Sequence, residues 1–222
     1  MTTQRLRLGV LAIQGDIEAH AAALEAAGGE AVPVLHARDL DALAGLVLPG
    51  GESTTIAKGL ERLALYQPLA AFARSGRPIL GTCAGAILLA RESRNHPVRT
   101  LGLIDAVAER NAYGTQVDSF ATQADPDAKE GLAGLRCVFI RAPRLSELGS
   151  AVEVLVRVDD APVLVRQGNV MASTFHPELG SDARIHALVV ESARLAREGG
   201  CGMHTTPEEP ASGPSSPSAP AR

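Results

Sequence analysis

The amino-acid sequence predicts an α/β fold with an open, doubly wound and mostly parallel sheet. Short apolar segments of strand length alternate with helical segments in the first half of the chain, as in βαβ units. The first of these segments is almost continuously apolar, which is typical of a parallel strand that is covered on both faces. In the second half, the β segments follow one another through shorter links, which predicts an antiparallel extension.

The predicted elements of the first half follow a regular order. Residues 6–13 form the first strand, and Asp16 is placed to cap a helix that ends before Gly28. Strands and helices then alternate, with strands expected at 31–35, 46–48 and 79–80 and helices at about 53–65 and 68–74.

The second half is expected to contain mainly β structure, then a helix and a tail. The expected β segments are 106–121, 137–140, 152–158, 161–166 and 170–174, and the last helix spans about 182–197. We therefore predict a single domain at 1–202. Residues 203–222 are rich in Pro, Ser and Ala, and are predicted to be disordered because they cannot bury enough apolar surface to offset the entropy of ordering.

Composition limits the possible functions. The 222 residues are 45% hydrophobic, enough for one sizeable core, and the net charge of −4 gives no indication of nucleic acid or a membrane as a partner. The apolar run 8–13 is too short for a signal peptide, and no run approaches transmembrane length. Three scattered cysteines argue against a disulfide scaffold, so a reducing, cytoplasmic location is expected.

The most informative stretch is a strand that breaks at Cys83 and continues directly into a helix. Gly81 and Gly85 flank the cysteine at minus two and plus two, which is the spacing of a nucleophile elbow. A thiol at a helix N-terminus lies in the positive field of the helix dipole, which favours the thiolate. The alternative is that Cys83 is simply a small, buried core residue.

A base for this nucleophile is expected at His176. This residue follows an apolar strand, and Pro177 turns the chain out of the sheet at the edge where open α/β sheets bind ligands. In an extended His-Pro-Glu segment, Glu178 points to the same side and can orient the imidazole. A solvent-facing turn is the alternative.

The remaining histidines are less suited to this role, because none has an acid at useful spacing after a strand. None is spaced with the cysteines like a zinc ligand, so no metal or other cofactor is expected. His20 and His186 fall in predicted helices, His36 and His96 in polar connections, and His204 beside the tail.

A glycine-rich loop at 48–55 can supply an oxyanion hole. Its two glycines allow backbone N–H groups to turn inward, and those of Gly51 and Ala84 are placed to bind a developing oxyanion together. The alternative is a loop that only caps a helix through Ser53. A phosphate loop is disfavoured, because the lysine of that motif is absent.

Two arginines complete the candidate site. Arg110 and Arg141 each follow a predicted β segment or lie within one, and either can grip the carboxylate of a substrate through two hydrogen bonds. An arginine is more commonly a solvated surface residue, so neither position would indicate function by itself.

Taken together, these motifs resemble those of the class I (triad) glutamine amidotransferases, and closely those of the glutaminase subunits of pyridoxal 5′-phosphate synthase. The elbow and His-Pro-Glu are shared across class I, whereas Val-Asp-Ser-Phe and Phe-Ile-Arg-Ala-Pro are specific to this branch. The resemblance implies a single-domain, flavodoxin-like fold of three layers. It rests on residues 9–15, 48–55, 81–85, 110–120, 139–143 and 173–179.

The resemblance also implies a role for each candidate residue. Cys83 would be the nucleophile, and His176 and Glu178 would complete the triad, hydrolysing L-glutamine to glutamate and ammonia through a glutamyl thioester. Gly51 and Ala84 would form the oxyanion hole. The residues that would bind glutamine are Gly51, Glu52, Ser53, Arg110, Ile140 and Arg141.

A partner follows from the same resemblance. Ammonia would pass to a synthase subunit that makes pyridoxal 5′-phosphate from ribose 5-phosphate and glyceraldehyde 3-phosphate, in a complex of twelve glutaminases around twelve synthase subunits. One departure bears on this expectation: Thr115 stands where the family usually has arginine, so a charge is lost in the glutamine pocket or at the partner interface.

Three other functions are compatible with parts of the sequence. Another triad glutaminase would feed a different acceptor, but the branch-specific motifs disfavour it. A DJ-1-like cysteine hydrolase would have a similar elbow, without His-Pro-Glu on a late strand. A scaffold that has lost the chemistry is disfavoured by the intact Cys83, His176 and Glu178, although Thr115 keeps this alternative open.

Overall fold

The computed structural model describes residues 5–110, 119–180 and 182–200. The predicted tail at 203–222 and the substituted position Thr115 lie outside these residues. None of the helices in the described ranges is long and apolar enough to cross a membrane.

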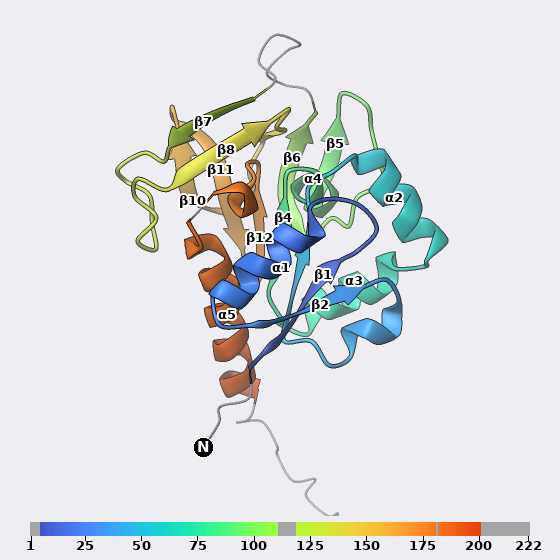
Figure 1. Ribbon diagram of the computed structural model, residues 1–222. Coiled ribbons are helices and arrows are strands. Elements are labelled where there is room, and N and C mark those ends of the chain that lie inside the picture. The colour runs from blue at the N-terminus through green and yellow to red at the C-terminus, as the bar shows by residue number, and fades with distance from the viewer. Residues whose placement is uncertain (1–4, 111–118, 181, 201–222) are drawn as a thin grey trace, which may run out of the picture.

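A seven-stranded sheet forms the centre of the molecule (Figure 1). In spatial order, the strands are β10 (Glu153–Val158), β11 (Ala161–Gln167), β12 (Val170–Ser173), β4 (Ile79–Thr82), β3 (Gly45–Leu48), β1 (Arg7–Leu11) and β2 (Glu30–Val34). The five strands from β12 to β2 are mutually parallel, whereas β11 and β10 continue the sheet in antiparallel fashion, as predicted.

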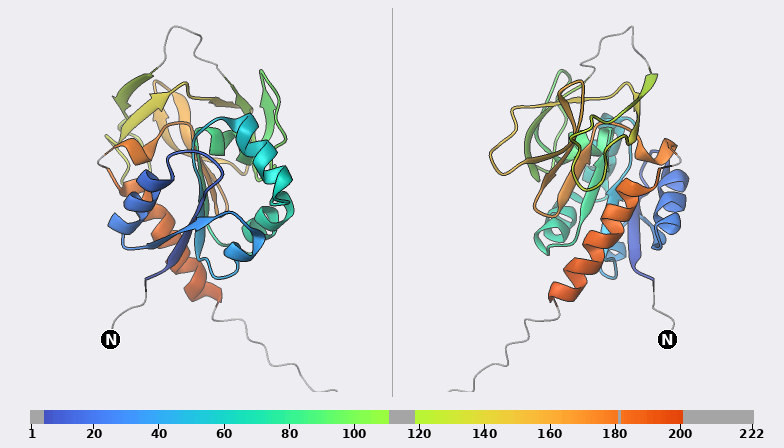
Figure 2. Two further views of the ribbon diagram at one scale, coloured as in Figure 1. Left: turned by 45° about the vertical axis from the view of Figure 1, so that its right-hand side comes forward. Right: turned by 90° about the vertical axis from the view of Figure 1, so that its left-hand side faces the viewer.

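Helices cover both faces of this sheet, which gives the three layers seen in Figure 2. Side chains alternate along β3, so that Leu46 and Leu48 join one buried cluster and Val47 joins the other. α2 (Ser53–Arg62), α3 (Tyr66–Arg74) and the short α4 (Ala84–Leu89) pack on the first side; α1 (Ile17–Ala26) and α5 (Arg184–Gly200) pack on the second.

Two smaller sheets lie beside the main one and correct the prediction for the second half. The segment 106–121, predicted as one β segment, is divided between β6 (Ile104–Glu109) and β7 (Ser119–Gln123), which belong to different sheets. β7 pairs with β8 (Arg136–Ile140). β6 pairs with two strands that the sequence pattern does not predict, β5 (Ala90–Arg94) and β9 (Arg144–Ser146).

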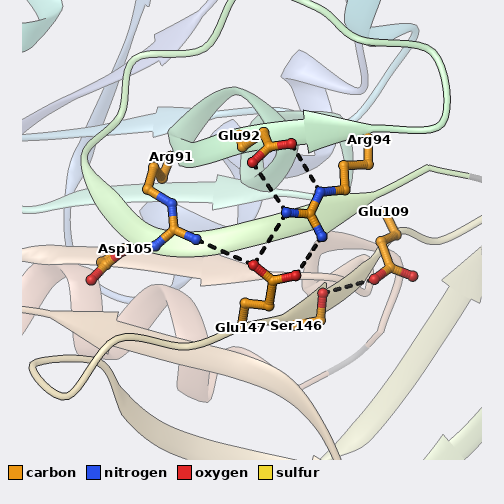
Figure 3. Close-up of polar contacts among 7 residues, drawn as sticks. All are labelled: Arg91, Glu92, Arg94, Asp105, Glu109, Ser146 and Glu147. Carbon is orange, nitrogen blue, oxygen red and sulfur yellow. Dashed lines mark hydrogen bonds and ion pairs between the residues drawn. The ribbon is translucent and has the colours of Figure 1, made fainter.

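Charged side chains explain why β5 and the end of β9 escape a prediction based on apolar patterns. Arg91 of β5 pairs with Asp105 of β6, and both Arg91 and Arg94 reach Glu147, which follows β9 (Figure 3). Arg94 also bonds Glu92 within its own strand, at 2.8 Å. Exposed pairs of this kind contribute only about 0–1 kcal/mol each, so they align the strands without forming a core.

Candidate active site

Three strands deliver the predicted motifs to one edge of the central sheet. β4 lies between β3 and β12 and is parallel to both, so the segments that follow these strands leave the sheet side by side. Cys83 follows β4, the Gly50-Gly51 loop follows β3, and His176 comes shortly after β12. The His176 N–H donates to the carbonyl of Val138 at 2.8 Å, which ties the same edge to β8.

The turn at Cys83 has the strained conformation that the elbow spacing predicts. Cys83 has φ 48° and ψ −103°, and its N–H donates to the carbonyl of Ser173 at 2.8 Å. A Cβ atom added at Gly85 would lie 2.0 Å from the carbonyl oxygen of Leu48, and one added at Gly81 would lie 2.6 Å from the backbone of Gly85. Both glycines are therefore required by close backbone contacts.

His176 and Glu178 form a buried pair. The imidazole Nδ1 and Glu178 Oε1 are 2.7 Å apart, and the exposed fractions of the two side chains are 13% and 1%. The predicted contact is confirmed, but its expected geometry is wrong: Pro177–Leu179 forms a short 3₁₀ turn (η2) rather than an extended segment. The tight turn brings the carboxylate within hydrogen-bond distance of the ring nitrogen Nδ1, and proline favours the first position of such a turn.

The surroundings of His176 favour its charged form. Burial alone would lower its pKa, but the Cys83 side chain and the Glu178 carboxylate outweigh this effect and raise the pKa to about 10. An imidazolium held between a thiol and a carboxylate is the arrangement of an activated cysteine nucleophile.

Gly50 makes room for the imidazole, a function that the sequence analysis did not assign to it. A Cβ atom at this position would lie 2.6 Å from Cε1 of His176 and 3.4 Å from Cβ of Cys83. The signal was present in the sequence as the first of two consecutive glycines, but only the fold shows which side chain each glycine faces.

Substitution of Gly50 by alanine is expected to displace the His176 ring and lower the rate constant of any reaction at Cys83 about 100-fold, because a misplacement of about 1 Å has effects of this size. Steady-state kinetics beside circular dichroism would measure it. Gly180→Ala is the matched control, since a Cβ there would meet no atom closer than 3.7 Å. Equal kcat values in the two variants would contradict the steric argument.

A cavity of about 370 Å³ opens at this edge and contains most of the candidate residues. Every predicted site residue lines it except Glu178, which lies behind His176. Gln14 also lines it, although the sequence analysis gave it no role; its Oε1 accepts from the Glu52 N–H at 3.1 Å. The predicted residues in the wall are Gly51, Glu52, Ser53, Cys83, Ala84, Arg110, Ile140, Arg141 and His176.

Glu52, rather than Ser53, caps α2. Its carboxylate accepts from the N–H groups of Thr54 at 3.0 Å and Thr55 at 2.7 Å, whereas Ser53 is the first residue of the helix. Burial would raise the pKa of Glu52, but these hydrogen bonds prevail and lower it to about 2. The helix end therefore brings a permanent negative charge to the cavity.

Arg110 is held against this charge. Its Nη2 lies 3.1 Å from Glu52 Oε1, and its Nη1 donates to the carbonyl of His96 at 2.8 Å. The side chain is only 16% exposed, so the two predicted binding residues Glu52 and Arg110 present fixed, opposite charges to the cavity.

Ile140 and Arg141 enter the cavity from β8 and the turn after it. Arg141 has φ 46°, a left-handed conformation that reverses the chain immediately after the strand. The carbonyl oxygen of Ile140 lies 3.9 Å from Sγ of Cys83, so this turn forms the wall opposite the elbow.

His20 is the main residue of this region that the sequence analysis set aside. It is fully buried on α1, and its Nε2 lies 3.4 Å from Oε2 of Glu178. In the described ranges, no group of three or more histidine, cysteine, aspartate and glutamate side chains is arranged to hold a metal ion.

Comparisons with known proteins show which family and which structures this chain is similar to. The model of the SNO glutamine amidotransferase family matches residues 10–195. A pyridoxal 5′-phosphate synthase subunit PdxT of Frankia casuarinae is 50% identical over 197 residues, covering 87% of this chain and 98% of that protein. The same-named subunit of Pseudothermotoga lettingae is 46% identical, covering 88% and 100%. A crystal structure of a glutamine amidotransferase superposes with a TM-score of 0.79 at 46% identity, covering 84% of this chain and 98% of the other.

Proposed function

The chain belongs to the SNO glutamine amidotransferase family and is a glutamine-hydrolysing enzyme, and from this premise we propose that it is the ammonia-producing subunit of a pyridoxal 5′-phosphate synthase. The observation that carries the proposal is that Cys83 and His176 line one cavity, with Glu178 bonded to His176 behind it. The chain is also about half identical to synthase subunits over nearly their whole length.

Hydrolysis begins with attack of the Cys83 thiolate on the amide carbon of the glutamine side chain. A C–S bond forms, and the oxygen takes up negative charge that the N–H groups of Gly51 and Ala84 stabilise, each donor being worth roughly 3 kcal/mol. His176 then gives its proton to the leaving nitrogen, so that ammonia departs and a glutamyl thioester remains. His176 next takes a proton from water, whose oxygen attacks the thioester and releases glutamate and the thiolate. Glu178 keeps the imidazole oriented throughout.

The charges of the cavity match those of a free amino acid. An arginine at 110 or 141 holds the α-carboxylate through paired hydrogen bonds. The ionised Glu52 holds the α-ammonium group, which is attached to the same carbon as the α-carboxylate. The backbone of Gly51 and Ser53 adds hydrogen bonds to the substrate, and Ile140 packs against its methylene groups. The substrate thus enters with its amide towards Cys83.

Ammonia passes from this site to the synthase subunit, which uses it with ribose 5-phosphate and glyceraldehyde 3-phosphate to make pyridoxal 5′-phosphate. We place this activity in the cytoplasm, in a complex of twelve subunits of each kind. Residues 1–202 form the glutaminase domain in this proposal.

Release of glutamate from glutamine, with and without a pyridoxal 5′-phosphate synthase subunit from one of these relatives, tests the proposal. We expect the rate to rise on addition of the synthase, since enzyme sites of this kind are commonly completed by a conformational step. Labelled amide nitrogen should appear in pyridoxal 5′-phosphate. If the rate of glutamate release does not change on addition of the synthase, and no labelled nitrogen enters pyridoxal 5′-phosphate, the ammonia has another acceptor. Absence of glutamate from protein shown to bind the synthase would overturn the glutaminase activity and point to Thr115.

A further inference from the structure

A second row of buried polar groups lies behind the triad, outside the cavity. Nδ1 of His20 lies 3.0 Å from Nε2 of His186, which comes from α5. On its other side, Nε2 of His20 lies 3.2 Å from Oγ1 of Thr82 and 3.4 Å from Oε2 of Glu178. His20, His186 and Thr82 are completely buried, so water does not compete for these contacts.

The contacts of the two imidazoles select one arrangement of their protons. If Nε2 of His20 carries the hydrogen, it is directed at the Thr82 hydroxyl and the Glu178 carboxylate, and Nδ1 accepts from Nε2–H of His186. His186 Nδ1, which makes no hydrogen bond among the described residues, is then an acceptor only. An unpaired acceptor nitrogen leaves no buried N–H group without a partner.

The opposite arrangement is disfavoured on two counts. If His20 donated from Nδ1, its Nε2 lone pair would face the negatively charged Oε2 of Glu178. His186 would then carry its hydrogen on Nδ1, as a buried donor without an acceptor, which is unfavourable because the desolvation of the N–H group is not compensated. The donors therefore run in one direction, from His186 to His20 and from His20 towards Thr82 and Glu178.

Both imidazoles are neutral in this arrangement. Burial lowers the pKa of His20, and the nearby His176 adds to this effect, while Glu178 and Asp16 oppose it. Burial, together with His20, lowers the pKa of His186 to about 3. The charged groups that face His20 thus include Asp16 on its own helix and the triad pair across from it.

We propose that His20 is a positioning residue of the reaction, which directs its Nε2–H towards the second oxygen of Glu178 across 3.4 Å, and that His186 holds it in the required tautomer. This inference rests on the proposed function. Oε2 of Glu178 makes no regular hydrogen bond in the described part of the chain. His176 contacts one oxygen of the Glu178 carboxylate and His20 lies beside the other, so the carboxylate has a fixed orientation. A fixed carboxylate in turn keeps the imidazole of His176 oriented towards Cys83.

His20→Leu and His20→Gln form the decisive pair of variants. Leucine removes the donor, and kcat should fall about tenfold with little change in KM, because His20 does not line the cavity. The terminal amide of glutamine can donate from the place of Nε2, so His20→Gln should restore much of the rate. Val189→Ala, a buried variant of α5 in the core cluster that also contains Leu24 of α1, controls for lost stability and should leave kcat within about twofold.

A double-mutant cycle separates positioning from a merely structural effect. Since His20 acts through Glu178, His20→Leu should change kcat less than about twofold when Glu178 is already glutamine. An equal loss in both backgrounds, or equal rates of the leucine and glutamine variants, would overturn the inference. If His20→Leu does not fold, the test rests on His20→Gln and His186→Leu. His186→Leu should lower kcat when Glu178 is present and should have no further effect when Glu178 is already glutamine. A wild-type protein without glutaminase activity would instead refute the proposed function.

Discussion

Replacement of Cys83 by alanine is expected to lower glutamine hydrolysis by about 10⁴-fold or more, since loss of a nucleophile removes the covalent route altogether. The residual rate would come from the oxyanion hole and the bound substrate. The variant should fold normally, because alanine occupies less space at the turn and leaves the close contacts of Gly81 and Gly85 unchanged. Steady-state release of glutamate, measured with the synthase subunit present, gives the comparison.

Cys137 provides the matched control within the same chain. It is fully buried in the core, and burial raises the pKa of its thiol to about 12, so it is chemically inert at neutral pH. Cys137→Ala should keep kcat within about twofold even though it loses some stability. A chloroketone analogue of glutamine should add one label to the wild-type protein and to Cys137→Ala, and none to Cys83→Ala. A label or a normal rate in Cys83→Ala would contradict the assignment of the nucleophile.

Replacement of Glu178 by glutamine is expected to lower kcat about 10³- to 10⁴-fold, because a neutral amide holds the imidazole in the wrong tautomer. It should also lower the pKa of His176, since Glu178 is one of the two groups that raise it to about 10. Titration of the His176 ring protons by NMR, in the wild-type protein and in Glu178→Gln, measures this shift.

The same shift has a consequence for stability. The pKa of His176 is raised in the folded protein, so the stabilisation from its charged form is fully present below about pH 6.5, its ordinary value, and is lost as the pH rises through about 10. The difference in free energy of unfolding between the wild-type protein and Glu178→Gln should therefore shrink at high pH. His36→Gln, which replaces an exposed histidine, is the control. It should leave the pKa of His176 unchanged and should not alter the pH dependence of the free energy of unfolding. A wild-type His176 that titrates near 6.5 would refute the charged pair.

The first half of the fold, the turn at Cys83 and the contact of His176 with Glu178 could be predicted from the sequence because they depend on local patterns. β1 to β4 are short apolar runs separated by helix signals, and each is found within the predicted range or close to it. The elbow is likewise local: a cysteine between two glycines at the end of a strand requires the strained turn that Cys83 has. His176 and Glu178 are two residues apart, so their contact needed only the right turn between them.

Features that depend on distant segments were missed or misassigned. β5 and β9 are polar and are held by ion pairs to neighbours that no local pattern identifies. Ser53 was considered as the helix cap, whereas the backbone turns the Glu52 carboxylate onto α2. Even the contact of His176 with Glu178 came from a 3₁₀ turn rather than an extended segment.

His20 shows the limit most clearly. It shares the inner face of α1 with Leu24, a spacing visible in the sequence, and a histidine on such a face is usually a satisfied core residue. Its partner His186 is 166 residues away, and they meet only because α1 and α5 cover the same face of the sheet. The sequence by itself determined the candidate residues for the chemistry. The tertiary structure decided which groups surround them, because packing of distant elements sets the distances, burial and charge on which tautomers and pKa values depend.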